Sequence, residues 1–540
     1  MSALKKQRES DSDAIRKKFE QGLRLQAQDR HAEAVSRFRK VLAAQPADME
    51  ALKGLARSLI ATGQPGEAVD MLDRFAASAE NAEQPLYALA QVCLAIKHYR
   101  LAEELYERVL TITPDAPIAL VNLANLLDER GEAQRAADLL SRMLELDPNA
   151  ADAYASLGRI LANAAQFDDA IVCYRRAIEL KPDNPATYTN FGALLETLGE
   201  PGEALKVCER ALLLKPDCDA TRWNLARLLL ATGHIEAGWD MYGFGFACGQ
   251  RQPWRPFPGL IWEGEDLKGK TIMAWREQGL GDDLIFSTCY TDLIARAGHV
   301  IIETNPRLVS LYRRTWPEAT VRAETATSTG LENYGDVDFD FTAPAGMVAA
   351  HLRRSLDTFP AEPRFLMPDP ARVAECRRWL DTLGSGPVVG ISWSSAIKTK
   401  LRSLYYSELS DWKELFAIEG VRVVNLQYTD VTGEAEALQR DFGMTLHRMP
   451  GLDLFNDLEG AAALSACMNA VVAPSSFPAV LAASVGVPCF HYTAPHGWTR
   501  LGTDRMPWFP TMRCYTFDRA SDRPKLFARI VADTGAFLRD

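Results

Sequence analysis

The first half of the chain repeats one pattern of small and large positions every 34 residues. In each period a small residue is followed twelve positions later by an alanine, and four positions after that by a large residue. A proline closes most periods, and proline cannot continue a helical hydrogen-bond ladder. The pattern therefore predicts two antiparallel helices per period, crossing closely at the small residues. The small positions are Gly22, Ala56, Ala90, Ala124, Gly158, Gly192 and Ala226; the alanine positions are Ala34, Ala68, Ala102, Ala136, Ala170 and Ala204, with Gly238 in the seventh period; the large positions are Phe38, Leu72, Tyr106, Leu140, Tyr174, Cys208 and Tyr242; the prolines are Pro46, Pro114, Pro148, Pro182 and Pro216, with Glu80 in place of one more.

A period of 34 residues is that of the tetratricopeptide repeat (TPR). We therefore expect a charged tail over residues 1–14 and an all-α superhelix of about seven repeats over residues 15–248. Such arrays form a concave face that holds an extended peptide or a helix. An array that only supports the second half, or that mediates dimerisation, is the alternative. The aromatic run at 238–242 predicts a cap that joins the array to the next domain.

After a proline-rich connector at residues 249–270, short β-rich runs alternate with turns and helical stretches. This alternation predicts two Rossmann-type α/β halves, at residues 271–380 and 381–540, with ligands bound at the carboxyl ends of the strands. The expected strands are 271–275, 300–303, 388–393, 421–426, 470–473 and 489–491, and the expected helices include 283–296, 308–314 and 479–484.

Charge and composition narrow the class of protein. The net charge of -11 argues against nucleic acid as the main partner, because phosphate binding requires a basic surface. The charged N-terminal stretch carries no apolar secretory signal, and we expect a cytoplasmic protein. The uncharged stretch 469–491 contains three prolines, which favours a buried strand, turn and helix over a membrane span. The ten cysteines contain no CxxC pair, so we expect reduced thiols.

Four blocks of the second half carry a resemblance to a known group. They are EQGLGDDLIF from residue 277, VVGISWSS from 388, NLQY from 425 and PWFPTMR from 507. Together with the repeats, they resemble bacterial TPR-fused glycosyltransferases. The catalytic half of that group is similar to the heptosyltransferases of glycosyltransferase family 9, and its layout is similar to that of the eukaryotic O-GlcNAc transferase.

The resemblance implies a fold and an activity. It implies a GT-B-like pair of domains, an acceptor half followed by a nucleotide-sugar half. It also implies an inverting, metal-independent transfer with no cofactor besides the nucleotide-sugar co-substrate. The nearest functional analogue is a TPR-containing flagellin glycosyltransferase, which implies transfer of a nonulosonic acid to Ser or Thr of flagellin held by the repeats.

Asp282 is the candidate catalytic base. It follows a strand and the turn Gly279-x-Gly281, where absent side chains let a substrate approach closely. The resemblance supports this role, since the aspartate of the corresponding heptosyltransferase loop is the proposed base. The alternative is that Asp282 or Asp283 caps the following helix.

The donor site is expected in the second half. Ser475 and Ser476 open a helix of small residues, where free backbone N–H groups bind anions. Cations after the 388–393 strand would neutralise phosphate. Further candidates are hydroxyl donors, an amide at a strand end that would meet the base or ribose, and a histidine beyond a strand. These candidates are Lys398, Lys400 and Arg402; Ser394 and Ser395; Gln427; and His491.

The sequence departs from family 9 at the same turn. The family pattern, roughly D-T-x-x-x-H-L-A, places Ser475 at the acid, Ser476 at the threonine and Val480 at the histidine. The donor therefore differs from ADP-heptose, or the domain has lost activity. A donor with a sugar carboxylate would explain the lost acid, because two carboxylates repel each other. A TPR scaffold with a degenerate transferase domain, and transfer to a lipopolysaccharide-type glycan, remain as alternatives.

Two other motifs have simpler explanations. The acidic run DVDFD at 336–340 has the form of a metal-binding DxD, but its alternation predicts a turn entering a strand. His351, His491 and His496 lack partners at zinc-ligand spacing, so no metal site is expected.

Overall fold

The computed structural model describes residues 2–78, 83–255, 257, 259–324, 337–359, 361, 365–396, 405–495, 497–516 and 522–539, with side chains from residue 13. The chain divides into two compact units, Met1–Pro182 and Asp183–Asp540. The division falls within the predicted repeat array, so the second unit contains the last repeats as well as the sheets.

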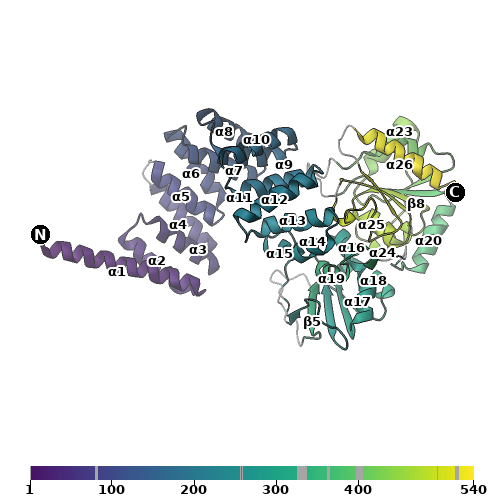
Figure 1. Cartoon of the computed structure of the whole chain (residues 1–540), viewed down its shortest axis with the longest axis horizontal. Helices are drawn as coiled ribbons and strands as arrows, with labels where there is room; N and C mark the ends of the chain where they lie inside the picture. The colour runs from purple at the N-terminus through teal and green to yellow at the C-terminus, as the bar shows by residue number, and fades with distance from the viewer. Residues whose placement is uncertain are drawn as a thin grey trace. The chain divides into compact units, whose positions relative to one another are not determined.

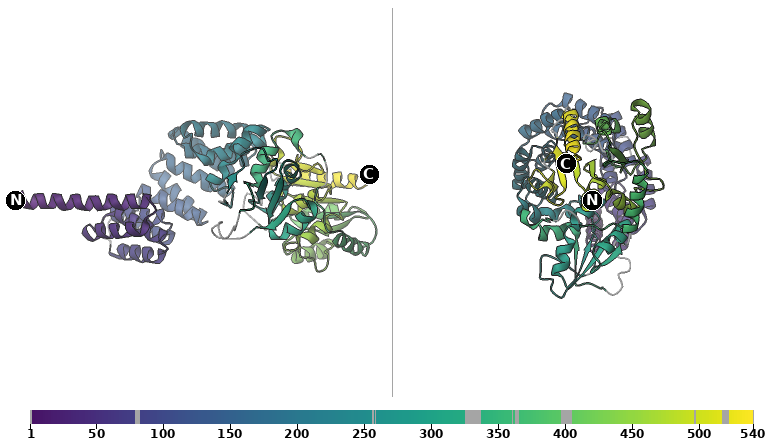
Figure 2. Two further views of the ribbon diagram at one scale, coloured as in Figure 1. Left: turned by 90° about the horizontal axis from the view of Figure 1, so that it is seen from below. Right: turned by 90° about the vertical axis from the view of Figure 1, so that its right-hand side faces the viewer.

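The first unit is a stack of antiparallel helix pairs, as the 34-residue pattern predicts (Figure 2). Where a repeat ends in proline, its second helix ends two residues before that proline. For example, α2 ends at Ala44, before Pro46. The helices are α1 (Ser2–Ala27), α2 (His31–Ala44), α3 (Met49–Ala61), α4 (Pro65–Ser78), α5 (Glu83–Ala95), α6 (Tyr99–Ile112), α7 (Pro117–Glu129), α8 (Ala133–Leu146), α9 (Ala151–Asn163) and α10 (Phe167–Leu180). Glu80 lies outside the described residues.

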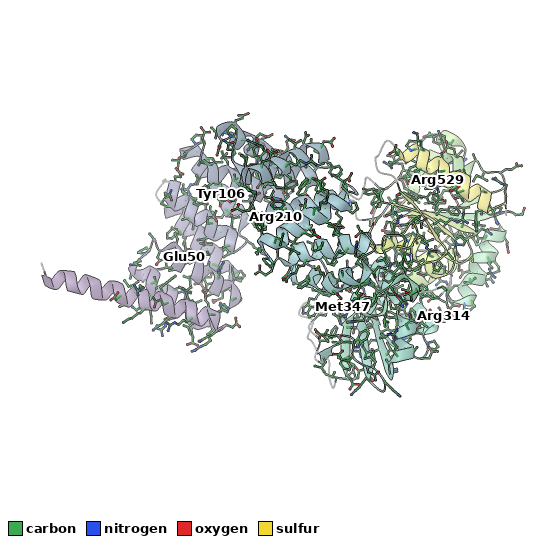
Figure 3. All side chains as sticks on the ribbon, in the orientation of Figure 1. Glu50, Tyr106, Arg210, Arg314, Met347 and Arg529 are labelled. Carbon is green, nitrogen blue, oxygen red and sulfur yellow. The ribbon has the colours of Figure 1, made fainter. Side chains whose placement is uncertain are left out.

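The small and large positions pack against each other as expected. Phe38 is fully buried between Gly22 and Gly54, and a Cβ at Gly54 would lie 2.6 Å from the Phe38 ring. Tyr106, which occupies the same position of a later repeat and is labelled in Figure 3, is also fully buried. The alanine of the second helix is fully buried in all six helix pairs that carry one. Glycine and alanine therefore set the distance between the helices of each repeat.

The second unit begins with further helical repeats and continues into two sheets (Figure 1). Its repeat helices are α11 (Pro185–Thr197), α12 (Pro201–Leu214), α13 (Asp219–Ala231), α14 (Ile235–Tyr242) and the short α15 (Phe244–Ala247). Trp239 and Tyr242 of α14 contact Trp498, with ring centroids 6.2 and 5.7 Å apart. The predicted aromatic cap therefore joins the last repeat to the α/β part.

The first sheet has five parallel strands in the order β1-β5-β2-β3-β4. The chain reverses its direction of winding between β2 and β5, and ligands bind at such switch points. The elements are β1 (Leu260–Ile261), β2 (Thr271–Trp275), α16 (Leu280–Ser287), α17 (Tyr290–Arg296), β3 (His299–Thr304), η1 (Pro306–Leu308), α18 (Val309–Thr315), β4 (Thr320–Ala323), β5 (Phe341–Pro344), α19 (Ala345–Leu352) and η2 (Leu356–Thr358).

The second sheet is also parallel, in the order β10-β9-β8-β6-β7, with its switch point between β6 and β8. Its inner strands β6, β8 and β9 are buried on both faces, as parallel sheets covered by helices require. The elements are α20 (Pro370–Asp381), β6 (Val388–Ile391), η3 (Leu409–Trp412), α22 (Lys413–Phe416), β7 (Arg422–Asn425), α23 (Thr432–Phe442), α24 (Leu458–Ser465), β8 (Ala470–Pro474), α25 (Phe477–Ser484), β9 (Cys489–Thr493), η4 (Trp498–Arg500), β10 (Met512–Thr516) and α26 (Arg523–Phe537).

Three details differ from the sequence-based expectation. The helix predicted at 283–296 is two helices, α16 and α17. The segment predicted as a connector contains β1, an edge strand of the first sheet. Helix α20, placed by sequence in the first half, packs on α24 of the second, where Arg372 forms an ion pair with Asp457.

Two expectations about the whole chain can be compared with the structure. All ten cysteines are free thiols, as expected. Among the described residues, no helix combines the length and apolar character needed to cross a bilayer.

Candidate functional site

A cavity of about 660 Å³ lies where loops from the carboxyl ends of both sheets meet. The first sheet contributes the β2–α16 loop, and the second contributes the loops that follow β7, β8 and β9. Seven residues predicted from sequence line it: Gly279, Gly281, Asp282, Ser395, Ser475, Ser476 and His491. The candidate base and the candidate anion-binding turn thus share one cavity within the second unit.

Asp282 lies in the first turn of α16, half-buried in the cavity wall. Its carboxylate accepts a hydrogen bond from the backbone N–H of Gly279, 3.2 Å away. The structure therefore places the helix-capping function at the same residue that faces the cavity.

Asp283, the next residue, is fully buried, and its side chain points away from the cavity toward β3 and α18. It accepts hydrogen bonds from Thr304 Oγ1 at 2.6 Å and from Tyr312 OH at 3.2 Å. Burial raises the pKa of Asp283 from 3.8 to about 6, against the opposing effects of Thr304 and Arg276. Asp283 thus fixes α16 to β3 and α18, and supports Asp282 from behind.

The raised pKa of Asp283 predicts how the free energy of unfolding depends on pH. Because the folded state holds the Asp283 proton more tightly than the unfolded chain, this group lowers stability as pH rises from about 4 to about 6. A shift of about 2 units corresponds to about 3 kcal/mol. The Asp283→Asn variant should lack this pH-dependent loss. Urea unfolding of wild type and variant between pH 4 and 7 measures the difference, and parallel curves for the two proteins would contradict the assignment.

Ser475 and Ser476 form the turn between β8 and α25, as expected. Ser475 is exposed to the cavity, whereas Ser476 Oγ donates to the carbonyl of Pro474 at 3.1 Å. The first backbone N–H groups of a helix have no partners within it and favour an anion. The turn is therefore suited to a phosphate or a carboxylate.

His491 on β9 adds a second polar group at this turn. Its side chain is buried and lines the cavity, and its Nδ1 has no hydrogen-bond partner in the described structure. Burial lowers the pKa of His491 to about 4, so the ring is neutral at pH 7. A buried ring nitrogen without a partner costs free energy that a bound ligand would recover.

Gln427 is buried just after β7, where it borders a cavity, and its side-chain amide also bonds to a neighbouring loop. Its Oε1 accepts hydrogen bonds from Ser392 Oγ and from the backbone N–H groups of Trp393 and Ser394, at 2.9, 3.2 and 3.1 Å. Its Nε2 donates to Thr429 Oγ1 at 2.9 Å. The amide therefore holds the loop after β6 in place.

Ser394 also lies elsewhere than predicted. It lines a separate cavity of about 530 Å³ bounded by η3 and α23, whereas Ser395 lines the main cavity and bonds to Tyr428 OH at 2.9 Å. Lys398, Lys400, Arg402 and His496 lie outside the described residues.

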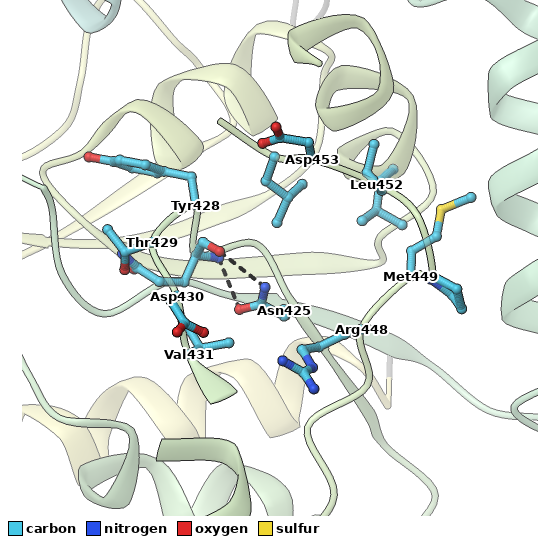
Figure 4. Close-up of a pocket in the computed structure, with 13 residues that line it drawn as sticks. Asn425, Tyr428, Thr429, Asp430, Val431, Arg448, Met449, Leu452 and Asp453 are labelled. Atoms are coloured by element: carbon cyan, nitrogen blue, oxygen red, sulfur yellow. Dashed lines mark hydrogen bonds between the residues drawn. The ribbon is translucent and has the colours of Figure 1, made fainter. Parts of the chain in front are cut away.

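A neighbouring cavity of about 520 Å³ opens beside the carboxyl end of β7 (Figure 4). Asn425 lies at its floor and exchanges two hydrogen bonds with the main chain of residue 427, at 3.0 and 3.2 Å. Tyr428 lines both this cavity and the main one. The two spaces therefore adjoin, and together they have room for a ligand with two parts.

Sequence reasoning missed Arg307 on η1. It lines the main cavity, and its Nη1 donates to the carbonyl of Phe455 at 2.6 Å, which joins the two halves at the cavity mouth. Arg307 and Asp282 are the charged residues among the described lining of this cavity. Its position directly after the β3 strand was the available signal, because such positions face the ligand side of a parallel sheet.

The acidic run leads into a strand, as predicted. Asp338 pairs with Arg322 at 3.1 Å, and the Asp340 carboxylate accepts from the backbone N–H of Thr271 at 2.8 Å, directly before β5. Asp336 lies outside the described residues. In the part of the chain that the structure covers, His, Cys, Asp and Glu side chains form no group of three that would hold a metal ion.

Comparison with known protein families finds matches for the N-terminal repeats. Residues 25–92, 94–160 and 185–218 match families described as Tetratricopeptide repeat, and residues 166–199 match a family described as TPR repeat. Among curated proteins, Protein FlbA of Caulobacter vibrioides is 35% identical over 304 residues, covering 54% of this chain and 51% of that protein. The chain thus spans about half the length of the curated relative it matches.

Solved structures give weaker matches. A tetratricopeptide repeat protein from Parabacteroides merdae aligns at 14% identity and a TM-score of 0.36, covering 44% of this chain and 94% of that one. YrrB, described as a TPR protein with an unusual peptide-binding site, aligns at 21% identity and a TM-score of 0.25, covering 34% and 95%. Scores this low do not establish a shared overall fold. The family matches show that residues 25–218 consist of tetratricopeptide repeats.

Proposed function

We propose that the second unit is a glycosyltransferase that moves a sugar from a nucleotide-sugar to Ser or Thr of a protein recruited by the repeats. The observation that carries this proposal is the single cavity in which Asp282 of one sheet and the Ser475–Ser476 turn with His491 of the other lie together. Glycosyl transfer requires a base for the acceptor, a stabilised leaving phosphate and a shared enclosed site.

The chemistry follows from these positions. Asp282 removes the proton of the acceptor hydroxyl, whose oxygen attacks the anomeric carbon and inverts it. The bond from that carbon to the phosphate oxygen breaks, and the nucleotide leaves with the bonding electrons. The α25 N-terminus and His491 Nδ1–H, in that tautomer, stabilise the charge on the phosphate. The nucleoside occupies the adjoining cavity at Asn425 and Tyr428. No metal or further cofactor enters this scheme.

The donor is proposed to be a CMP-activated nonulosonic acid. Such a donor carries one phosphate and a sugar carboxylate, and the turn that must receive them carries Ser475 and Val480, with no acidic side chain on either. An acidic residue there would repel this donor. The resemblance to TPR-containing flagellin glycosyltransferases makes flagellin the proposed acceptor, and repeats of this kind commonly bind protein segments.

The Ser475→Asp variant tests the anion site. A carboxylate at this exposed position should weaken binding of CMP-N-acetylneuraminic acid by about tenfold or more, because one like-charge contact costs about 1.4 kcal/mol or more. Calorimetric titration measures the effect. Ser410→Asp, on an exposed serine of the separate η3 cavity, is the matched control and should bind as the wild type does. Equal affinities for all three proteins would place the donor elsewhere.

The acceptor is tested in cells. The mass of flagellin from a wild-type strain should exceed that from a strain lacking this gene by a whole number of sugar residues. An unchanged flagellin mass, together with an unchanged mass of the other surface proteins, would favour the second reading, a TPR scaffold with a degenerate transferase domain. The loss of the family acid and histidine at Ser475 and Val480 is the observation that favours that reading.

A further inference from the structure

The turn that presents Asp282 is held in an unusual backbone conformation. Gln278, directly before Gly279, lines the main cavity and has a φ of 59°. This left-handed region costs energy for a residue with a side chain, and such residues concentrate at functional sites. Among the described non-glycine residues of the second unit, Gln278 shares a positive φ with Leu501 alone.

The last helical repeat holds Gln278. The Gln278 Nε2 donates to the hydroxyl of Tyr242, the last residue of α14, at 3.2 Å. The backbone of Gln278 is fixed on both sides, since its N–H donates to the carbonyl of Gln252 at 2.7 Å and its carbonyl accepts from Arg276 Nη2 at 2.9 Å. Tyr242 itself is fully buried and contacts Trp223, Trp239 and Phe286. A rigid helix end therefore fixes the strained residue beside the candidate base.

The same repeat also contacts a cavity loop that belongs to the second sheet. Trp498 of η4 lines the cavity and contacts Trp239 of α14. Beyond Leu501, the main chain at Gly502 runs so close to the repeat that a Cβ there would lie 2.7 Å from the backbone nitrogen of Gly233. Gln278 and Leu501, the two described non-glycine residues of the second unit with positive φ, thus lie in loops that contact the α13–α14 repeat.

We propose that Tyr242 is a positioning residue of the transfer site, which makes the α13–α14 repeat a part of that site as well as the end of the array. This inference rests on the proposed transferase function. Tyr242 acts through Gln278: it fixes the 278–282 turn so that the Asp282 carboxylate faces the acceptor hydroxyl. Small displacements of a reacting group lower rates steeply, so one hydrogen bond at this point has a large effect on turnover.

The test compares Tyr242→Phe with Tyr174→Phe in the full-length protein. Tyr174 occupies the same register position two repeats earlier and is equally buried, so both changes remove one buried hydroxyl and keep the ring. With CMP-N-acetylneuraminic acid and flagellin, Tyr242→Phe should lower kcat about tenfold with little change in the KM for flagellin. Tyr174→Phe should retain the wild-type kcat. Equal kcat values for Tyr242→Phe and an active wild type would overturn the proposal.

Two further measurements separate this inference from the proposed function. Hydrogen exchange of the 278–282 amides requires no substrate, and it should accelerate in Tyr242→Phe but not in Tyr174→Phe. If the wild type itself turns over no donor, the proposed function fails, and unchanged exchange in Tyr242→Phe then overturns the inference as well. The Gln278→Gly variant should keep or raise the thermal midpoint, because glycine accepts the left-handed conformation, while its kcat falls. A Gln278→Gly protein with full kcat would also contradict the proposal.

Discussion

The Asp282→Asn variant is expected to transfer sugar about 10²–10⁴-fold more slowly than the wild type, which is the usual contribution of a positioned base. Asparagine keeps the side-chain oxygen that accepts from the Gly279 N–H at 3.2 Å, so α16 retains its cap. It lacks the basicity needed to remove a hydroxyl proton. The loss should therefore appear in kcat, with donor affinity and thermal midpoint close to those of the wild type. Release of CMP in single-turnover experiments measures the effect.

The control for this variant is Asp48→Asn. Asp48 caps α3 through the N–H of Ala51 at 2.9 Å, and it lies in the first unit. Both aspartates accept a backbone N–H at the start of a helix, Asp48 as the N-cap residue and Asp282 at the third helical position, and of the two only Asp282 lines the cavity. If Asp282→Asn retains the wild-type rate, Asp282 is a cap only, and the base must be sought elsewhere in the cavity. If the wild type is also inactive, the failure lies with the proposed function.

The repeats could be predicted from the sequence because one geometric requirement recurs in every period. A further signal of the same kind was available: Asp29, Gly63, Lys97, Gly131, Ala165, Gly199 and Gly233 are spaced by 34 residues, and all have positive φ. Four of these are glycines, the residue that adopts this conformation without steric cost. The packing between helices thus follows from the same residue pattern in every repeat, and that pattern is enough to predict the array from the sequence.

The sheets were less predictable where local and tertiary preferences compete. The helix expected over 283–296 ends at Ser287, where the hydroxyls of Ser287 and Thr288 bond to the carbonyls of Leu284 and Ile285. Such local bonds compete with helix continuation. Strands β1 and β4 lie at the edges of their sheet and alternate little or not at all in burial. No hydrophobic pattern marked them.

Site residues could be predicted where their location depends only on the order of strands and helices along the chain. Ser475 follows β8 directly, Asp282 lies in the first turn of the helix after β2, and both line the cavity as expected. Gln427 lies two residues after β7, but its amide bonds to the loop after β6, and that loop lies 33–35 residues away in sequence. The partner of a buried amide depends on tertiary packing, so no sequence motif revealed this role.

The Glu277→Gln variant is expected to destabilise the second unit by about 3–5 kcal/mol, the cost of leaving one partner of a buried ion pair uncompensated. Glu277 and Arg251 have no exposed side-chain surface, and Arg251 Nε donates to Glu277 Oε2 at 2.7 Å. Arg251 also donates to the carbonyl of Tyr242 at 3.0 Å, and Glu277 accepts from the N–H of Gly346 at 2.7 Å. The ion pair therefore connects the last repeat with the segment after β2 and with the start of α19.

The measurement is urea unfolding followed by tryptophan fluorescence. All eleven tryptophans lie beyond residue 222, so the signal reports the second unit alone. Asp441→Asn, which breaks the exposed pair with Arg440, is the control and should cost less than about 1 kcal/mol. In the double variant with Arg251→Met, part of the stability should return, because the isolated buried charge is gone. A Glu277→Gln protein as stable as Asp441→Asn would mean that the Arg251 charge is compensated by its aromatic and carbonyl contacts alone. The loop that carries Asp282 would then be held by Tyr242 and Gln278 and not by this pair.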